Sequence, residues 1–314
     1  MTQLPVSLFR AYDIRGIFDD TLTLEAARLI GRAIGSEVRR QGGDTLALAR
    51  DGRLSGPALL DALAEGVQAC GCAVVDLGMV PTPVLYFATW HYPGVNSGVM
   101  VTGSHNPPDY NGFKIVINGT TLSGDAIQAL KQRIQSQDFS EADRPAGREQ
   151  RDVLPAYLQA LLERHRAPRP LKVVVDCGNG VSGVIAPRAL REIGYEVVPL
   201  FDEVDGTFPN HHPDPGDPEN LRDLMREANL EVRPADLDRV VVDGGPDGSG
   251  GEPVADVAGA VHRRPRGHGP LDQSGLETAV VAQRPTGHEP AIAPTSDAQT
   301  ALVDLGQSFQ VVGQ

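Results

Sequence analysis

The sequence predicts an α/β fold in which two domains on mixed or parallel sheets precede a divergent, poorly ordered C-terminal tail. Between about residues 20 and 140, short apolar runs alternate with segments of helical periodicity, as in strands joined by helices across a sheet. A second strand–turn–helix–strand unit lies near residues 171–200. Beyond residue 251 neither periodicity continues. We therefore expect domains at 1–150 and 151–250 and a tail at 251–314.

The distribution of aromatic residues supports the boundary before the tail. Of the 15 aromatic residues, all except Phe309 lie between Phe9 and Phe208. Aromatic side chains bury large areas and dominate protein cores, so an ordinary domain contains several of them. The stretch 209–308 contains none. Part of this gap precedes residue 230, and the remainder is sequence for which we expect little order.

The elements of the first domain follow from periodicity and from helix-start and helix-stop signals. Thr23 is a suitable N-cap for a helix that ends before Gly42, and Pro57 suits the first turn of the next helix. The expected elements are, in order, a helix at 24–38, a strand at 45–49, a helix at 57–70, a strand at 73–77, a helix at 84–90, strands at 98–102 and 113–117, and a helix at 125–134. The charged, aperiodic stretch 138–152 is expected to be a linker.

The second domain is expected to begin with a helix at 154–165. A continuous apolar strand at 171–175 then passes through a glycine-bearing turn into a helix at 184–193, and a strand at 196–200 completes a βαβ unit. A further strand is expected at 240–242.

Charge argues against two classes of partner. The chain has 314 residues with 28 Lys+Arg and 41 Asp+Glu, a formal net charge of −13. An acidic protein repels phosphate backbones and anionic lipid headgroups, so we expect neither nucleic-acid nor membrane binding through bulk charge. The N-terminal residues lack a basic segment followed by an apolar run, and no apolar stretch is long enough to span a bilayer.

The cysteines indicate the compartment. Cys70, Cys72 and Cys177 are odd in number and scattered, which fits neither a disulfide framework nor a four-ligand zinc site. We therefore expect a cytoplasmic protein with reduced thiols. The sequence does not indicate an oligomeric state.

The strongest local signal is the segment Thr102–Lys114, TGSHNPPDYNGFK. Ser104 follows a predicted strand, beside a glycine and ahead of two prolines, on a turn whose backbone can approach a phosphate closely. It could therefore carry or attack a phosphoryl group, with His105 and Lys114 as nearby groups that stabilise charge or move protons. The alternative for a Ser-His pair alone is an ordinary polar turn, but thirteen residues in this order are far more specific than a pair.

The basic residues give Lys114 additional weight. The chain has 25 Arg and only three Lys, namely Lys114, Lys131 and Lys172. Guanidinium stays protonated, whereas a desolvated ammonium group can lose its proton and act as a general base. A surface lysine is the alternative, and its position beside the serine favours catalysis.

Two arginine-bearing segments have both a functional and a structural interpretation. Arg15 could bind a phosphate that Tyr12 positions, or a structural salt bridge could be formed by Asp13 or by Arg15. The loop Arg50–Arg53 allows the same two interpretations, a phosphate contact or a structural ion pair.

Three further motifs carry weaker signals. Asp243 and Asp247 follow the predicted strand at 240–242, where carboxylates suit Mg²⁺, although two Asp residues in a Gly/Pro loop are equally typical of a turn. The turn at 176–183 matches no phosphate-binding fingerprint and is interpreted as mainly structural. Adjacent His211 and His212 rarely both face one metal ion, and the surrounding prolines favour an ordered loop.

In combination, the motifs FRAYDIRG, ARDGRLSG, VTGSHNPPDYNGFK, DCGNGVSG and PNHHPDP…PENL occur in the order typical of the α-D-phosphohexomutases. Over about residues 1–230 the chain resembles the bacterial phosphomannomutase/phosphoglucomutase branch of this family. The resemblance implies phosphohexomutase-type α/β domains and the interconversion of hexose 1- and 6-phosphates of mannose or glucose. It implies a hexose phosphate substrate and a hexose 1,6-bisphosphate intermediate.

The resemblance also assigns roles to individual residues. It implies that Ser104 is the phosphoserine, Lys114 the general acid/base and His105 an active-site histidine, with Tyr12 and Arg15 as substrate contacts. Mg²⁺ would be bound by the Ser104 phosphate together with Asp243 and Asp247.

The chain departs from the family after about residue 235. The family's Asp-Gly-Asp-Gly-Asp-Arg loop reads here as Asp243-Gly-Gly-Pro-Asp247-Gly, with Gly245 in place of the middle carboxylate. No motif of the third or fourth family domain follows. The sequence therefore leaves open a mutase, a non-catalytic remnant or sugar-phosphate-binding module, and a reading-frame change near 231–250 that re-reading the gene in all frames would reveal.

Overall fold

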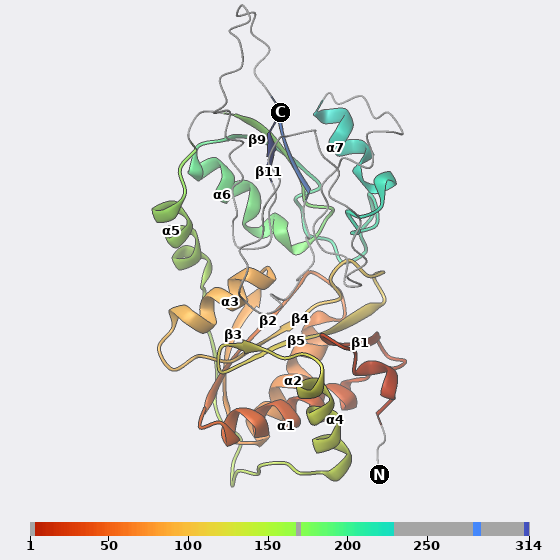
Figure 1. The fold of residues 1–314 in the computed structure, drawn as a ribbon, viewed down its shortest axis with the longest axis vertical. Helices are drawn as coiled ribbons and strands as arrows, with labels where there is room; N and C mark the ends of the chain where they lie inside the picture. Colours follow the sequence, from red (N-terminus) through yellow and green to blue (C-terminus); the bar gives the residue numbers. More distant parts are fainter. Residues whose placement is uncertain (1–3, 168–170, 229–278, 284–310, 314) are drawn as a thin grey trace, which may run out of the picture. The chain divides into compact units, whose positions relative to one another are not determined.

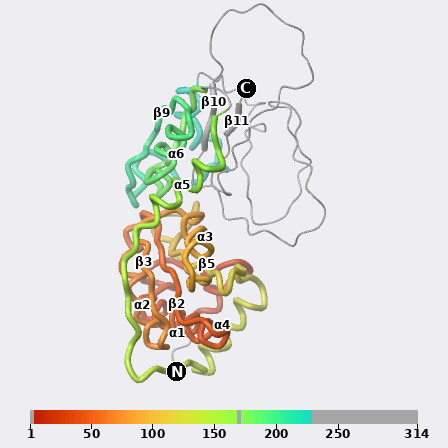
Figure 2. The backbone as a smooth tube through the Cα atoms, turned by 90° about the vertical axis from the view of Figure 1, so that its left-hand side faces the viewer, coloured from red at the N-terminus to blue at the C-terminus, as the bar shows by residue number. Residues whose placement is uncertain are grey.

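A computed structural model of the chain describes residues 4–167, 171–228, 279–283 and 311–313. Two compact units are present, each containing one sheet: unit 1 comprises Met1–Tyr157 with Asp205–Pro209, and unit 2 comprises Leu158–Val204 with Asn210–Gln314. The ribbon is shown in Figure 1 and the chain trace in Figure 2. The predicted strand at 240–242, Asp243, Asp247 and most of the predicted tail lie outside the described residues.

The elements of unit 1 are the short helix η1 (Val6–Leu8), β1 (Ile14–Ile17), α1 (Leu24–Arg40), β2 (Thr45–Arg50), α2 (Gly56–Ala69), β3 (Ala73–Met79), α3 (Thr82–His91), β4 (Gly98–Val101), β5 (Tyr110–Ile117), β6 (Thr120–Thr121), α4 (Asp125–Ser136) and β7 (Arg148–Gln150). In the described part of this unit the sheet has seven strands, in the order β1-β5-β4-β2-β3-β7 with β6 paired to β5. Strands β2, β3, β4 and β7 run parallel to one another, and β5 is antiparallel to both β1 and β4. The sheet is therefore mixed, as the sequence predicts.

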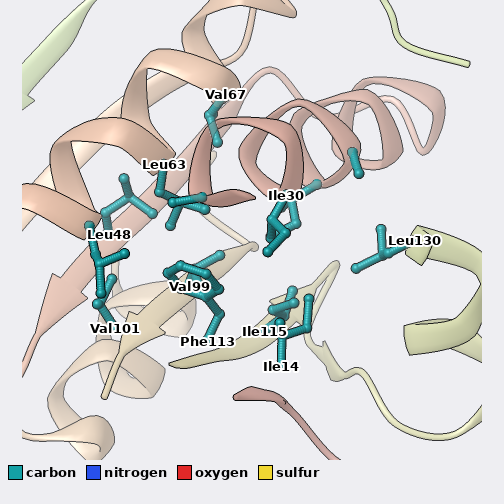
Figure 3. Close-up of a cluster of buried hydrophobic side chains, with 14 of the residues drawn as sticks. Ile14, Ile30, Leu48, Leu63, Val67, Val99, Val101, Phe113, Ile115 and Leu130 are labelled. Carbon is teal, nitrogen blue, oxygen red and sulfur yellow. The ribbon is translucent and has the colours of Figure 1, made fainter. Parts of the chain in front are cut away.

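The core of unit 1 lies between the sheet and helices α1, α2 and α4 (Figure 3). Thr23 caps α1 as predicted, because its side chain accepts a hydrogen bond of 3.1 Å from the Ala26 amide. Helices α1 and α2 approach closely because glycines lie at their contact: a Cβ on Gly66 would lie 2.1 Å from the Arg28 carbonyl oxygen. Helix α3 packs on β2 and β4 and contributes buried residues of its own, including Leu85 and Ala88.

Unit 2 contains β8 (Lys172–Asp176), η2 (Val181–Val184), α6 (Ala186–Ile193), β9 (Glu196–Leu200), η3 (Pro218–Leu221), α7 (Arg222–Glu227), β10 (Ala279–Gln283) and β11 (Val311–Gly313), and α5 (Leu154–Arg164) joins the two units. Its described strands form a sheet in the order β11-β10-β8-β9. The predicted βαβ unit is present, with β8 parallel to β9. Leu221, Leu224 and Met225 pack against Val174, so η3 and α7 cover part of this sheet.

Two predictions about individual segments are wrong. The expected linker at 138–152 contains β7, which pairs in parallel with β3 although all three of its residues are exposed. Strand β5 begins at Tyr110 rather than at residue 113, because its first residues pair with β1. No helix among the described residues has the length and apolar character needed to cross a bilayer.

Candidate functional site

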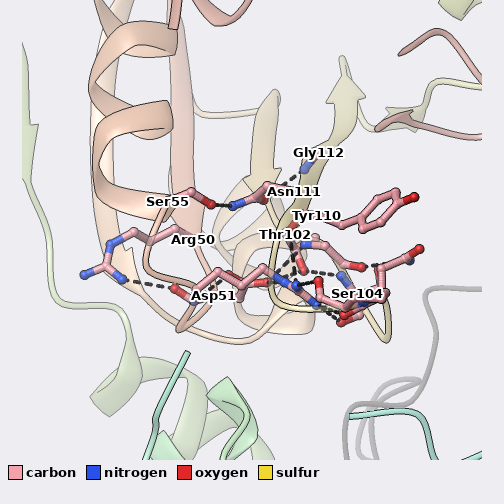
Figure 4. Close-up of polar contacts among 12 residues, drawn as sticks. Arg50, Asp51, Ser55, Thr102, Ser104, Tyr110, Asn111 and Gly112 are labelled. Carbon is pink, nitrogen blue, oxygen red and sulfur yellow. Dashed lines mark hydrogen bonds and ion pairs between the residues drawn. The ribbon is translucent and has the colours of Figure 1, made fainter. Parts of the chain in front are cut away.

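The serine loop, defined as residues 102–110, connects β4 to β5 (Figure 4). Ser104 is only 8% exposed and has a φ of +50°, in the left-handed region that residues other than glycine rarely adopt. Its amide donates a 2.9 Å hydrogen bond to the Thr102 hydroxyl, and its carbonyl accepts one of 2.7 Å from Arg53. Both polar groups of the Ser104 backbone are therefore held.

Asp51 anchors the start of this loop from the end of β2. Its buried carboxylate accepts hydrogen bonds from the Thr102 hydroxyl at 2.7 Å, the Gly103 amide at 3.2 Å and the Arg53 Nε at 3.2 Å. The Arg53 amide donates to the other carboxylate oxygen at 3.0 Å. The sequence left the loop Arg50–Arg53 open between a phosphate contact and an ion pair, and the structure shows the ion pair.

Glycine is needed next to the serine for a steric reason. A Cβ on Gly103 would lie 2.4 Å from both Cζ and Nε of Arg53 and 2.7 Å from the Tyr110 carbonyl oxygen. The absence of a side chain at this position lets the guanidinium reach the loop.

Lys114 and Arg15 lie on the same face of the sheet. Ile14, Phe113 and Ile115 point into the main core, and successive side chains of a strand point to opposite faces. Arg15, which pairs with Gly112, and Lys114 therefore point away from that core, on adjacent strands. Lys114 is buried, with 8% of its surface exposed.

The two predicted substrate-binding residues, Tyr12 and Arg15, have different surroundings. Tyr12 is 54% exposed and lies just before β1. Arg15 forms an ion pair with Asp13, which is the structural alternative that the sequence allowed. The Arg15 Nε is buried without a hydrogen-bond partner. One hairpin and the strand beside it thus carry Ser104, His105, Lys114 and Arg15.

Two of the three proposed metal ligands are not among the described residues. Asp243 and Asp247 lie outside the described residues, which leaves Ser104, whose hydroxyl alone does not make a magnesium site. The carboxylate of Asp51, which anchors the serine loop, already accepts four hydrogen bonds within unit 1. Within the ranges that the structure describes, no group of three or more His, Cys, Asp or Glu side chains could hold a metal ion.

The two weaker motifs of unit 2, the turn at 176–183 and the pair His211 and His212, contact each other. The Nε2 of His211 lies 3.2 Å from both carboxylate oxygens of Asp176, and its Nδ1 lies 2.9 Å from the His212 carbonyl oxygen. The hydrogen bond with Asp176 raises the pKa of His211 against the opposing effect of burial, and the charge of Asp223 adds to the rise. Asp176 also accepts from the Gly178 amide, so the pair fastens the loop at 209–212 to the turn after β8.

This pair predicts a pH dependence of stability. The folded-state pKa of His211 is raised, so its contribution is complete below the ordinary value of about 6.5 and is lost as the pH rises through the folded-state value. Urea unfolding followed at several pH values is expected to show the wild type losing stability relative to His211→Gln over that range. His212→Gln, with an exposed ring nearby, is the control. A difference between wild type and His211→Gln that does not change with pH would contradict the prediction.

The three cysteine thiols lie in the interior of the protein. Cys70, Cys72 and Cys177 are all free and buried. Burial raises the pKa of Cys72 and of Cys177 to about 12, so neither forms a thiolate near neutral pH. Cys72 and Cys177 are therefore components of the interior and not nucleophiles.

Comparison with known proteins gives consistent matches over both units. The family "Phosphoglucomutase/phosphomannomutase, alpha/beta/alpha domain I" matches residues 6–141, and the corresponding domain II matches residues 155–249. A Pseudomonas aeruginosa protein named phosphomannomutase/phosphoglucomutase is 56% identical over 234 residues, covering 74% of this chain and 50% of that protein. A Neisseria meningitidis phosphoglucomutase is 48% identical over 225 residues, covering 72% of this chain and 49% of that protein.

A solved structure agrees. The crystal structure of a phosphoglucomutase/phosphomannomutase family protein from Burkholderia thailandensis has a TM-score of 0.68 and 51% sequence identity, covering 73% of this chain and 50% of that one. The chain spans about half the length of the curated relatives it matches. On the two domain matches and this likeness, the chain belongs to the phosphoglucomutase/phosphomannomutase family.

Proposed function

We propose that the chain transfers phosphoryl groups as part of an intramolecular phosphotransferase that interconverts hexose 1-phosphate and hexose 6-phosphate, with mannose, glucose or both as the sugar. The observation that carries the proposal is the serine loop. Ser104 has a left-handed backbone conformation, and it is held at its amide by the Thr102 hydroxyl and at its carbonyl by the buried Arg53 guanidinium. Relatives named as phosphomannomutase/phosphoglucomutase make this chemistry the natural use of such a loop.

In the proposed reaction, phosphorylated Ser104 gives its phosphoryl group to a free hydroxyl of the sugar phosphate. The hydroxyl oxygen forms a bond to phosphorus while the bond from phosphorus to Oγ of Ser104 breaks. Lys114, as a neutral amine, accepts the proton of the attacking hydroxyl and then gives a proton to the released serine oxygen. The hexose 1,6-bisphosphate then returns its other phosphoryl group to Ser104 by the reverse steps.

The remaining predicted site residues have binding roles in this proposal. His105, next to the serine, stabilises negative charge on the transferred group. Arg15 and Tyr12 hold the substrate phosphate, and Arg15 suits this because a guanidinium can offer two parallel N–H groups to one phosphate. In the free chain, its Nε is buried without a hydrogen-bond partner.

Magnesium is the proposed cofactor, with the Ser104 phosphate, Asp243 and Asp247 as ligands. A hard divalent cation supplies stabilisation of the charge on phosphate oxygens when it is bound. We also propose a cytoplasmic location, because a reducing compartment suits three buried thiols.

The direct test is phosphorylation of Ser104. Incubation of the full chain with glucose 1,6-bisphosphate and Mg²⁺ is expected to add one phosphoryl group, which peptide mass spectrometry places on Ser104. Ser104→Ala is expected to abolish the addition, whereas Ser123→Ala, at an exposed position, is expected to leave it unchanged. A folded wild-type chain that takes up no phosphoryl group would overturn the proposal.

A non-catalytic sugar-phosphate-binding module is the second candidate. One observation favours it: Gly245 stands where the family has a carboxylate. Calorimetry that detects binding of mannose or glucose 1-phosphate, together with no conversion to the 6-phosphate, would support this candidate.

A further inference from the structure

Arg53 is not one of the predicted substrate-binding residues, yet it makes an unusually large set of contacts. Its side chain is completely buried, with 0% exposed. Its Nε donates to Asp51, and its two terminal nitrogens donate to four backbone carbonyl oxygens of the serine loop: those of Ser104 and Asn106 at 2.7 Å, of Tyr110 at 3.1 Å, and of Pro107. One guanidinium therefore sits at the centre of the loop and organises its carbonyl groups.

Only an arginine can make these contacts. The guanidinium offers five N–H groups in a planar fork, whereas a lysine ammonium offers three donors around one point. Four carbonyls and a carboxylate accept from the three nitrogens of the Arg53 group, which matches five donors and not three. Gly103 lies close enough that a Cβ there would overlap the guanidinium.

The surroundings of Arg53 exclude water. The ring of Phe208 lies over the guanidinium, with 5.2 Å from Cζ to the ring centroid. Gly206 of the same segment packs beside the Arg53 backbone, since a Cβ there would lie 3.0 Å from its Cα. Hydrogen bonds in such a place are stronger than in water, so the loop is held firmly.

These contacts determine the placement of the reacting serine. The Ser104 carbonyl is bound by Arg53 and its amide by Thr102, whose hydroxyl in turn donates to Asp51. A change in the direction of the Arg53 bond would rotate the peptide after Ser104, which changes ψ of Ser104 and the path of the loop that follows it. The side chain of Ser104 would then move relative to Lys114, which is fixed in β5.

We propose that Arg53 is a positioning residue for phosphoryl transfer: it acts through the backbone of the serine loop and does not itself contact the substrate. This inference rests on the proposed function of Ser104. Displacement of a reacting group by about 1 Å costs on the order of 10²-fold in rate. Arg53→Lys is therefore expected to lower the maximal rate of Ser104 phosphorylation by about 10²-fold. The half-saturating concentration of the bisphosphate is expected to stay unchanged, because the substrate contacts remain.

The experiment uses the full chain with Mg²⁺ and glucose 1,6-bisphosphate as the phosphoryl donor. Phosphorylation rates over a range of donor concentrations are measured for wild type, Arg53→Lys and the exposed-helix control Arg39→Lys. Arg53→Ala is measured with and without added guanidinium, which is expected to restore part of the rate where ammonium does not. Hydrogen exchange of peptides from residues 102–110 is expected to speed up in Arg53→Lys while α1 and α2 keep wild-type protection.

The possible results distinguish the positioning role of Arg53 from the proposed function of Ser104. A wild-type rate in Arg53→Lys would overturn the positioning role, and so would faster exchange spread evenly over unit 1, which would make Arg53 only a stabilising residue. If the wild type takes up no phosphoryl group, the proposed function of Ser104 fails. The exchange comparison still decides in that case whether Arg53 holds the loop, because it needs no turnover.

Discussion

Replacement of Lys114 by methionine is expected to slow phosphorylation of Ser104 by about 10²–10⁴-fold, the usual contribution of a positioned general acid or base. Methionine matches the length of lysine and is well tolerated in a buried position, so the fold is expected to survive. Lys114 lies in β5 opposite Met100, with most of its surface buried. The measurement is the rate at which the chain takes up a phosphoryl group from glucose 1,6-bisphosphate, with circular dichroism as the check on folding.

Two further variants separate proton transfer from charge. Lys114→Arg keeps a positive charge but cannot release a proton near neutral pH, so we expect it to be as slow as Lys114→Met. Lys131→Met removes a lysine from α4, away from the serine loop, and is expected to retain the wild-type rate. Near-wild-type phosphorylation in Lys114→Arg would show that Lys114 contributes charge only.

Asp51→Ala is expected to destabilise unit 1 by about 3–5 kcal/mol, because loss of one partner of a buried ion pair leaves the other charge uncompensated. In this case the uncompensated group is the Arg53 guanidinium, which has no exposed surface. The Thr102 hydroxyl and the Gly103 amide lose their acceptor at the same time. Urea unfolding at neutral pH measures the change in free energy of unfolding.

An exposed aspartate provides the matched control. Asp61 forms an ion pair with Arg148, but its side chain is 60% exposed. Surface ion pairs contribute about 0–1 kcal/mol, so Asp61→Ala is expected to have little effect. Equal losses in Asp51→Ala and Asp61→Ala would contradict the special role of the buried pair.

The sequence predicted the parts of the fold that local patterns determine. The Thr23 cap, the apolar stripes of α1 and α2 and the apolar strands β2 and β8 each carry their signal in neighbouring residues. Strand β7 carries none, because its residues are exposed and its pairing with β3 comes from backbone hydrogen bonds to a distant segment. The early start of β5 likewise depends on β1, nearly a hundred residues away in the sequence.

The candidate site also has a part that local sequence predicts and a part that depends on contacts between distant segments. Ser104, His105 and Lys114 fall within one short motif, so their placement on one hairpin could be predicted. The roles of Asp51 and Arg53 could not, because they depend on the approach of a loop after β2 to a loop after β4. One signal was present in the sequence: Gly103 beside the serine indicates a close approach, although not the group that approaches. His211 and Asp176 are separated by 35 residues and illustrate the same limit.

The segment Asp205–Pro209 has a consequence for the order in which the chain is made. It belongs to unit 1, where Phe208 covers Arg53, although the segments on either side of it belong to unit 2. Domains begin to fold during synthesis, from the N-terminus onward. The cover of Arg53 is therefore missing until residue 208 has left the ribosome, long after the serine loop itself has been synthesised. The nascent chain must carry an incompletely covered guanidinium through this interval, and unit 1 reaches its final state only after the first segment of unit 2, Leu158–Val204, has been made.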